Sequence, residues 1–447
     1  MDAAWTPLFR GRRCTVKAYE TVRGMRDFLP EELGRRRRIE DEVRRLFRLF
    51  CYREIETPVV ESFSLLSAKA GEEIRHRMYM FRDLGGRKIA LRPEMTASVA
   101  RIVATKLRSE PKPLRLGYIA NCFRYDNPQM GRYREFWQAG YELFGSNRPE
   151  ADAEILAICH DLLRALGLDV SIKVGHVGIL RGILTSECVN EANQNIIMGL
   201  LDKGKTRTAA KTMKDLGVKE ATLKTIRLLQ NLKGSDTEAI LRSGEDEIQG
   251  NETACLSLIN LRSITGLARS AGVMCPIIVD LGFTRGLDYY TGMIFELYSP
   301  QLAIALGGGG RYDHLVDTFG GESTPAVGCS PGIDRIALAM EKSGLFNDLD
   351  SLRNRIMVVP IGEAQVAVVL ELASKLRETD ISVQVEVSGR NVRDALSYAS
   401  GLGFVGMLIV GPREAASGKA TLRDLKSKVQ QEVSFDGVVE AVKTLLK

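Results

Sequence analysis

FRYDNPQMGRYREFWQAGYELFG, residues 123–145, is the stretch that decides the fold. It predicts two strands joined by a polar loop. After the loop, Phe136, Gln138 and Glu142 are separated by even intervals, and even intervals place side chains on one face of a strand. That face then carries an aromatic ring, an amide and a carboxylate, where a buried face normally carries Val, Ile or Leu.

Arginines surround the loop of this predicted hairpin. Arg124 stands before it, and Arg132 and Arg134 lie within it. A cationic loop over a polar strand face suits a small charged substrate that carries phosphate. On this pattern alone, the alternative is an ordinary amphipathic hairpin whose polar face points to solvent.

Length and composition bound the class of protein. A chain of 447 residues is too long for one core and predicts two to four domains. Hydrophobic residues make up 45% and charged residues 26%, as in globular proteins, and no run approaches the ~18 apolar residues of a membrane span. The basic start of the chain lacks the apolar core of a secretory signal. We expect a disordered tail or a generous start site there, with an organelle-targeting role as the weaker alternative.

The net charge of +6 gives little support for nucleic-acid binding, because the first fifty residues hold thirteen Lys and Arg against eight Asp and Glu. The remainder of the chain is therefore close to neutral. Eight scattered cysteines form no C-x-x-C pair, which argues against a zinc ribbon and indicates reduced thiols in a cytoplasmic protein. The four histidines show no metal-ligand spacing.

Several elements follow from periodicity before the hairpin. GMRDFLP, residues 24–30, predicts a turn that leads into a helix over 31–50. CYREIETPVVES, residues 51–62, predicts a strand in which Pro58 marks an edge, a bulge or an interface. Residues 87–91 predict a strand, and the following helix has Thr96 as its expected cap. Glu94 then lies at the positive end of that helix, where it could receive an ammonium group or serve only as a capping carboxylate.

After the hairpin, residues 148–166 predict a helix, and residues 186–265 predict a helical unit inserted between strands of a larger domain. LGGGGRYD, residues 306–313, allows close approach of the backbone to a ligand, or is a plain glycine turn. It is not G-x-G-x-x-G followed by a helix, so a dinucleotide site is disfavoured. Residues 326–340 predict a strand that runs into a helix, with Arg335 near its start in reach of a phosphate or in a surface ion pair.

The last ninety or so residues predict a separate unit in which strands alternate with helices. This order favours a mostly parallel sheet covered by helices, with a binding role. Upstream, TRGLDYYTG at 284–292 sets Tyr289 and Tyr290 beside Arg285, a group that suits a small polar ring next to an anion.

These motifs together resemble the histidyl-tRNA synthetases over nearly the whole chain. LRPEMTASVAR, the hairpin, RGLDYYTG, GGGGRYD and VGCSPGIDRIAL follow one another as they do in that family. The resemblance implies an α+β fold with a class II antiparallel sheet flanked by helices. It also implies a catalytic domain in two parts (1–185 and 266–345), a helical insertion (186–265) and a C-terminal α/β anticodon-binding domain (355–447).

The resemblance further implies the chemistry. ATP activates histidine to histidyl-adenylate, with Mg²⁺ accompanying the ATP, and the histidyl group then passes to the 3′ end of tRNA(His). A homodimer with Pro58 in its interface is expected, without any membrane. The first step joins two anions, so charge stabilisation should dominate catalysis.

Site residues are carried over by the same resemblance. Expected catalytic residues are Arg124 and Arg285. Expected histidine-binding residues are Glu94, Met95, Thr96, Arg124, Gln138, Glu142, Arg285, Tyr289 and Tyr290, with Glu142 and Tyr290 on the two imidazole nitrogens. Expected ATP-binding residues are Arg124, Asp126, Arg132, Phe136 and Arg335. The sequence departs from the commonest pattern at Met95, where many members have glycine, at Asp126, where many have glutamate, and at the Cys329-Ser330-Pro331 filling.

Three other functions remain open. The first is a non-catalytic regulatory subunit of histidine biosynthesis, although such proteins usually lose motif residues and the anticodon domain. The second is a synthetase-like domain of a stress-sensing kinase, although the chain carries no kinase signature. The third is an adenylating enzyme that acts on another acceptor.

Overall fold

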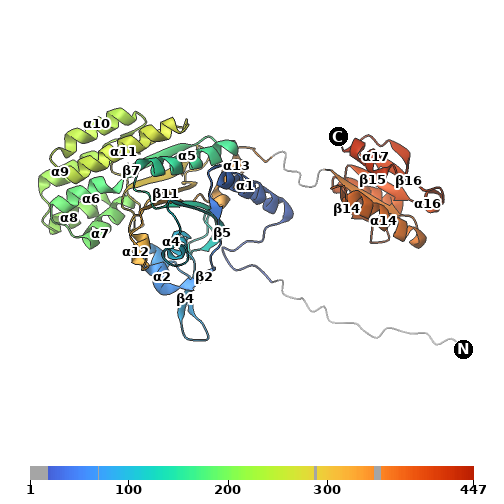
Figure 1. Ribbon diagram of the computed structural model, residues 1–447, viewed down its shortest axis with the longest axis horizontal. Coiled ribbons are helices and arrows are strands. Elements are labelled where there is room, and N and C mark those ends of the chain that lie inside the picture. Colours follow the sequence, from blue (N-terminus) through green and yellow to red (C-terminus); the bar gives the residue numbers. More distant parts are fainter. Residues whose placement is uncertain (1–18, 69, 286–288, 347–353, 447) are drawn as a thin grey trace. The chain divides into compact units, whose positions relative to one another are not determined.

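The computed structural model describes residues 19–68, 70–285, 289–346 and 354–446. The chain forms two compact units, residues 1–347 and residues 348–447 (Figure 1). The expectation of a disordered tail falls on residues 1–18, which lie outside the described residues, as do Gly286–Asp288 of the RGLDYYTG motif. No helix of the described ranges has the length and apolar character needed to cross a membrane.

A nine-stranded sheet forms the centre of the first unit, and the six strands from β5 to β7 pair with one another in antiparallel fashion. Only the outer pairs β1/β5 and β7/β9 are parallel. This confirms the expected antiparallel sheet. The strand order is β1 (Arg53–Glu54), β5 (Leu114–Phe123), β6 (Glu135–Phe144), β12 (Ala326–Cys329), β11 (Gly307–Arg311), β10 (Met293–Tyr298), β7 (Ser171–His176), β9 (Ile277–Asp280) and β8 (Lys233–Gly234).

Helices cover both faces of this sheet. On one face, α1 (Pro30–Leu49), α5 (Pro149–Ala165) and α13 (Ile333–Lys342) bury their apolar stripes in one core with the sheet (Figure 1). The apolar residues of α1 recur at helical spacing, which is why this sequence forms a helix that packs along one side. On the other face, α4 (Thr96–Thr105) and α12 (Leu315–Thr318) pack in a second core.

A small three-stranded sheet, in the order β2–β4–β3, lies next to α4. It shows that one predicted strand is wrong. The predicted strand over 51–62 is two short strands in different sheets, β1 and β2 (Val60–Ser62), and Pro58 lies between them. Arg92 stabilises the segment between β1 and β2, because its guanidinium donates to the carbonyl of the buried Thr57 (2.7 Å). The remaining elements are α2 (Phe63–Ser67), α3 (Glu72–His76), β3 (Met80–Arg82) and β4 (Lys88–Leu91).

Helices make up most of residues 177–270, a longer segment than the 186–265 that the sequence predicts, and the short edge strand β8 interrupts them (Figure 1). They are α6 (Val177–Ser186), α7 (Glu191–Asp202), α8 (Thr206–Asp215), α9 (Glu220–Asn231), α10 (Thr237–Ile248) and α11 (Glu252–Ser270). Helix α11 packs along both α5 and α6, so the helical segment shares the core of the sheet. The four-part division given above stays a prediction.

The second unit is a five-stranded sheet with helices, in the strand order β14–β13–β15–β16–β17. Only β14, β13 and β15 are parallel, while β16 and β17 are antiparallel, so the sheet is mixed and not mostly parallel. Strand β17 was missed because its residues are mostly polar. The bounds are β13 (Arg355–Pro360), α14 (Val366–Arg377), β14 (Ser382–Val385), α15 (Val392–Gly401), β15 (Gly406–Val410), α16 (Pro412–Ala416), β16 (Lys419–Asp424), β17 (Gln430–Ser434) and α17 (Val438–Leu445).

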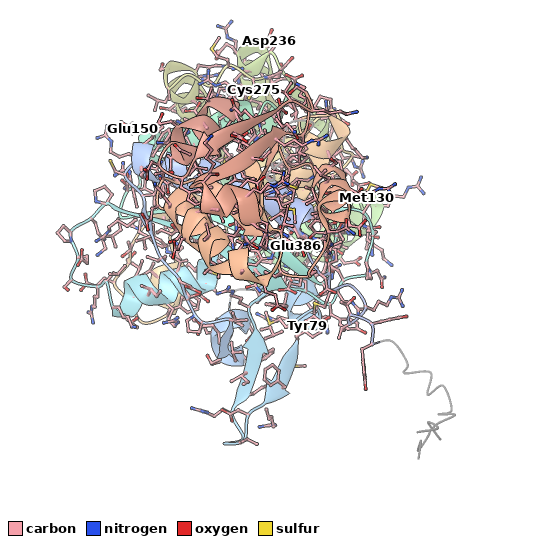
Figure 2. The ribbon with its side chains drawn as sticks, turned by 90° about the vertical axis from the view of Figure 1, so that its right-hand side faces the viewer. Tyr79, Met130, Glu150, Asp236, Cys275 and Glu386 are labelled. Carbon is pink, nitrogen blue, oxygen red and sulfur yellow. The ribbon has the colours of Figure 1, made fainter. Side chains whose placement is uncertain are left out.

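The loop that follows β14 is fixed by a buried carboxylate. Glu386, labelled in Figure 2, accepts from the Arg390 guanidinium at 2.8 Å, and this pairing and neighbouring backbone N–H groups hold its pKa below the usual value against the effect of burial. The loop therefore has a defined shape at the carboxyl end of a parallel strand, where α/β units commonly bind ligands.

Candidate active site

A cavity of about 280 Å³ opens at the centre of the first unit and gathers residues from distant parts of the sequence. The structure brings eleven of the thirteen expected site residues to its wall. They are Glu94, Thr96, Arg124, Asp126, Arg132, Phe136, Gln138, Arg285, Tyr289, Tyr290 and Arg335. The other two, Met95 and Glu142, are buried behind the wall.

Four arginines face this cavity without a carboxylate within 4 Å among the described residues. Three of them bond backbone carbonyls instead: Arg124 bonds Pro93 (2.8 Å), Arg285 bonds Phe295 (2.7 Å) and Arg335 bonds Gly131 and Ala305 (3.1 and 2.8 Å). The fourth, Arg132, is exposed. Burial, and then repulsion from Arg124 and Arg132, lowers the pKa of Arg335. A guanidinium without a close carboxylate is available to an anionic ligand, although acidic side chains such as Asp202 and Glu296 also line the cavity.

Glu94 caps helix α4. Its carboxylate accepts from the backbone N–H of Thr96 (2.8 Å) and of Ala97 (3.1 Å). Thr96 is the first residue of the helix and not the cap that the sequence predicted. The Glu94 carboxylate, two residues upstream, satisfies the free N–H groups instead. Met95 is fully buried, and Thr57 donates to its sulfur at 3.7 Å.

Glu142 is a buried carboxyl surrounded by hydroxyl groups. Thr96 Oγ1 donates to it at 2.9 Å, the Tyr118 hydroxyl at 3.4 Å, and the Tyr312 hydroxyl also donates to it. Burial raises its pKa to about 8, although these hydroxyl hydrogen bonds act in the opposite direction. A Cβ built on Gly328 would lie 1.6 Å from Glu142 Oε2, so only glycine fits on the neighbouring strand.

Tyrosine rings form the side of the cavity next to Glu142. The ring of Tyr289 lies 4.8 Å from that of Tyr290 and 5.6 Å from that of Tyr312, and all three are buried. Arg285 lies 5.8 Å from the Tyr290 ring centroid. The pair of tyrosines beside an arginine is thus placed as the sequence predicts, with an aromatic wall next to a cation.

The glycine-rich residues Gly307–Arg311 form strand β11, so the alternative prediction of a plain glycine turn is wrong. Residues 307–311 pair with β10 and β12 in the middle of the sheet. At its end, Arg311 forms a buried ion pair with Asp152 of α5 and also bonds Asp313 (3.1 Å). Burial raises the pKa of Asp152 to about 6, against the attraction of Arg311. Arg311 therefore fixes the strand end from which Tyr312 reaches Glu142.

Sequence reasoning missed four residues of this site. Tyr312 was quoted only within GGGGRYD, and Tyr118 lies at an even interval before Arg124, a signal that could have found it. Glu296 of β10 and Asp202 of α7 also line the cavity. Desolvation and the charge of Glu296 raise the pKa of Asp202.

The helical segment closes one side of the cavity. Lys203, next to Asp202, forms an ion pair with Glu73 of α3 (3.0 Å), and both Asp202 and Glu73 line the cavity wall. No sequence motif marked this contact, because it joins two polar helix ends 130 residues apart. The helical segment therefore contributes a residue to the cavity wall, although the sequence predicted it as a separate insertion.

An antiparallel sheet that sets four arginines without a close carboxylate beside a pocket of tyrosines fits the class II aminoacyl-tRNA synthetases. The family model described as "Histidyl-tRNA synthetase" matches residues 24–336, and the model "Anticodon binding domain" matches residues 355–445. The chain therefore belongs to the histidyl-tRNA synthetase family.

Individual relatives agree with this assignment. A histidine–tRNA ligase of Methanocaldococcus jannaschii is 40% identical over 424 residues, which is 94% of this chain and 99% of that protein. The apo structure of S. aureus histidyl-tRNA synthetase is 25% identical, with a TM-score of 0.69 over 95% of this chain and 100% of that one. An ATP phosphoribosyltransferase regulatory subunit/histidyl-tRNA synthetase structure from Bacillus halodurans is 27% identical, with a TM-score of 0.74 over 88% of this chain and 98% of that one.

Proposed function

We propose that this cavity performs both steps of histidine–tRNA ligation: ATP and histidine give histidyl-adenylate and pyrophosphate, and the histidyl group then passes to the terminal ribose of tRNA. Membership of the family makes the chain an ATP-dependent histidine–tRNA ligase. The observation that carries the residue-level proposal is the set of four cavity arginines without a carboxylate within 4 Å in the described residues. They lie beside a pocket of tyrosines and a buried carboxyl.

Arg124 and Arg285 are the proposed catalytic residues. When the histidine carboxylate attacks the α-phosphate of ATP, negative charge builds up between the two reactants. Two guanidinium groups already fixed by backbone carbonyls can neutralise that charge without reorganising. Removal of one such preorganised contact typically costs ~10²–10³ in rate.

The adenine and the outer phosphates are assigned to the loop side of the cavity. The half-buried ring of Phe136 offers a surface on which adenine can stack, and Asp126 lies at the same edge. Arg132 and Arg335 then hold the outer phosphates. Their mutual repulsion favours binding of the anion that relieves it.

Histidine is assigned to the tyrosine side. Glu94, Thr96 and Gln138 would receive its ammonium and carboxylate groups. Glu142 lies behind the cavity wall, so it would accept from one imidazole nitrogen in place of one of its hydroxyl donors. The Tyr290 hydroxyl would donate to the other nitrogen, with Tyr289 adjacent. A pocket built for both bonds leaves buried groups unpaired around an isostere that lacks them, and such pockets can discriminate by ~10⁴–10⁵.

A divalent cation is expected with ATP, and we propose Mg²⁺. The described residues contain no group of three His, Cys, Asp or Glu side chains arranged for a metal ion. Mg²⁺ that enters on the phosphates of ATP commonly needs only one or two protein carboxylates. Glu296 and Asp202 are the proposed partners, because repulsion between them would be relieved by a cation, which would itself reduce the charge of the phosphates.

The tRNA contacts and the assembly complete the proposal. The C-terminal unit, matched by the anticodon-binding model, would read the anticodon of tRNA(His), and the helical insertion would approach the acceptor arm. A cytoplasmic homodimer with Pro58 in the interface remains proposed, as do domain limits at 185, 265 and 345. The regulatory-subunit alternative is less supported, because the chain keeps its arginines and its anticodon domain.

Aminoacylation tests the proposal. Purified protein is incubated with ATP, Mg²⁺, total tRNA and each labelled amino acid in turn. We expect labelling of acid-precipitable tRNA with histidine and not with the other nineteen. Labelling with another amino acid, or none with histidine from a folded protein, would contradict the assignment of the pocket.

A further inference from the structure

Arg26 lies in the segment 23–28 that precedes α1, and its guanidinium touches two parts of the active-site wall at once. Its Cζ lies 3.3 Å from the ring centroid of Tyr133 in the loop between β5 and β6. It also forms an ion pair with Asp334, near the start of α13. Tyr133 and Asp334 both line the active-site cavity. Arg26 itself lines a second cavity of about 110 Å³, whose wall shares Tyr133 and Asp334 with the active-site cavity.

The backbone of residues 23–24 is hydrogen-bonded to the loop between β5 and β6. The backbone N–H of Arg134 donates to the Gly24 carbonyl (2.9 Å), and the Arg134 guanidinium donates to the Arg23 carbonyl (3.2 Å). Gly24 has φ +85°, and a Cβ there would lie 2.7 Å from Arg134 Cγ. The close approach therefore depends on glycine at this turn.

These contacts hold the neighbours of Arg132 on both sides. Gly131 accepts from Arg335 Nε (3.1 Å), Tyr133 lies under Arg26, and Arg134 is 9% exposed. Arg132 itself is exposed, and the loop tip Met130, labelled in Figure 2, is 65% exposed. The Arg132 backbone also pairs with that of Gln129 (2.8 and 3.1 Å), while its side chain makes no hydrogen bond or ion pair with the described residues. The position of Arg132 therefore depends on its backbone and its anchored neighbours.

Asp334 extends the connection to the other phosphate-binding arginine. Its side chain is 6% exposed, and Oδ2 accepts from the backbone N–H of Trp137 (2.6 Å), so it joins α13 to β6. Arg335 is the next residue along α13. A buried carboxylate needs a partner charge, and Arg26 supplies it from outside the catalytic sheet.

We infer that Arg26 is a positioning residue for ATP: by joining Tyr133 to Asp334 it fixes the separation of Arg132 and Arg335, which the proposed function assigns to the outer phosphates. The inference rests on that assignment. It gives the GMRDFLP segment a role in substrate binding beyond leading into a helix. Arg26 does not line the active-site cavity and would act only through Tyr133 and Asp334.

Binding measured by calorimetry separates positioning from folding. Full-length Arg26→Ala is titrated with ATP in magnesium buffer and, separately, with histidine. The cation–π stack and the ion pair are together worth about a factor of ten in Kd. We expect ATP affinity to fall about tenfold while histidine affinity changes less than twofold. Arg26→Lys, which keeps the charge but loses the planar stack, should recover part of the loss.

Arg35→Ala is the matched control. The Arg35 guanidinium on α1 forms an ion pair with Glu341 of α13 at 3.1 Å, which resembles the pair of Arg26 with Asp334. The Glu341 side chain, however, is 59% exposed and lies outside the active-site cavity. ATP binding by Arg35→Ala should equal that of the unsubstituted protein. If Arg26→Ala does not fold, Arg26→Gln combined with Asp334→Asn removes both charges and should show the same selective loss.

Two results would overturn the inference: unchanged ATP affinity in folded Arg26→Ala, or an equal loss of ATP and histidine affinity. A different result, in which the unsubstituted protein binds no ATP, would instead overturn the proposed function.

Discussion

Glu142→Gln should change how stability depends on pH. In the folded protein the Glu142 carboxyl has a pKa of about 8, raised from 4.5 chiefly by burial. Between these two values the folded state holds a proton that the unfolded state has lost. The free energy of unfolding contributed by this group is therefore greatest below pH 4.5, falls as pH rises through 8, and is constant above it.

The size of the effect follows from the same values. One pKa unit corresponds to about 1.4 kcal/mol, so the contribution of Glu142 falls by about 2 to 3 kcal/mol between pH 6 and pH 9. A glutamine at this position does not ionise. Thr96 and Tyr312 bond different oxygens of the Glu142 carboxyl. The amide oxygen of glutamine can accept from one of these hydroxyls and its NH2 group can donate to the other, so the variant should fold.

Urea unfolding of substrate-free protein at pH 6, 7, 8 and 9 measures this. We expect the stability of Glu142→Gln relative to the unsubstituted protein to rise by about 2 to 3 kcal/mol across the series. Glu341→Gln, which alters an exposed carboxylate of the same unit, should give a constant difference. Parallel pH curves for the Glu142 pair would refute the claim that this carboxyl is protonated in the empty pocket.

Three further substitutions separate structure from binding. Arg311→Ala leaves Asp152 buried and unpaired, so the free energy of unfolding should fall by about 3–5 kcal/mol in denaturant titrations; a loss below 1 kcal/mol would contradict a buried pair. Gly328→Ala sets a Cβ against Glu142, so in pyrophosphate exchange the KM for histidine should rise at least about tenfold and the KM for ATP less than twofold; equal changes would show a general distortion. Arg132→Ala removes an exposed side chain, so the unfolding midpoint should stay constant while the KM for ATP rises about tenfold; an unaltered KM would exclude its phosphate role.

Local patterns predicted much of the fold. Even spacing predicted the β5–β6 hairpin, and helical periodicity predicted α1 and α5, because each segment buries one face along its own length. Where burial is incomplete the pattern weakens: β17 is polar along most of its length. The four glycines of β11 resemble a turn locally, and only their pairing with two neighbouring strands makes them a strand.

The candidate site was predicted where its residues sit within motifs and missed where the fold brings them from elsewhere. Arg124 and Gln138 lie in one hairpin, so their proximity follows from register. Tyr312 reaches Glu142 only because β11 and β12 place residues 170 positions apart side by side. Asp202 arrives from a helix whose own sequence carries no sign of chemistry.

Amino-acid-dependent ATP–pyrophosphate exchange by purified protein tests the central claim most directly. We predict exchange with histidine and with none of the other nineteen amino acids, and a loss of ~10²–10³ in rate for Arg285→Ala, which should still bind histidine. Exchange with a different amino acid, or no exchange by a folded protein that binds both ATP and histidine, would contradict the account.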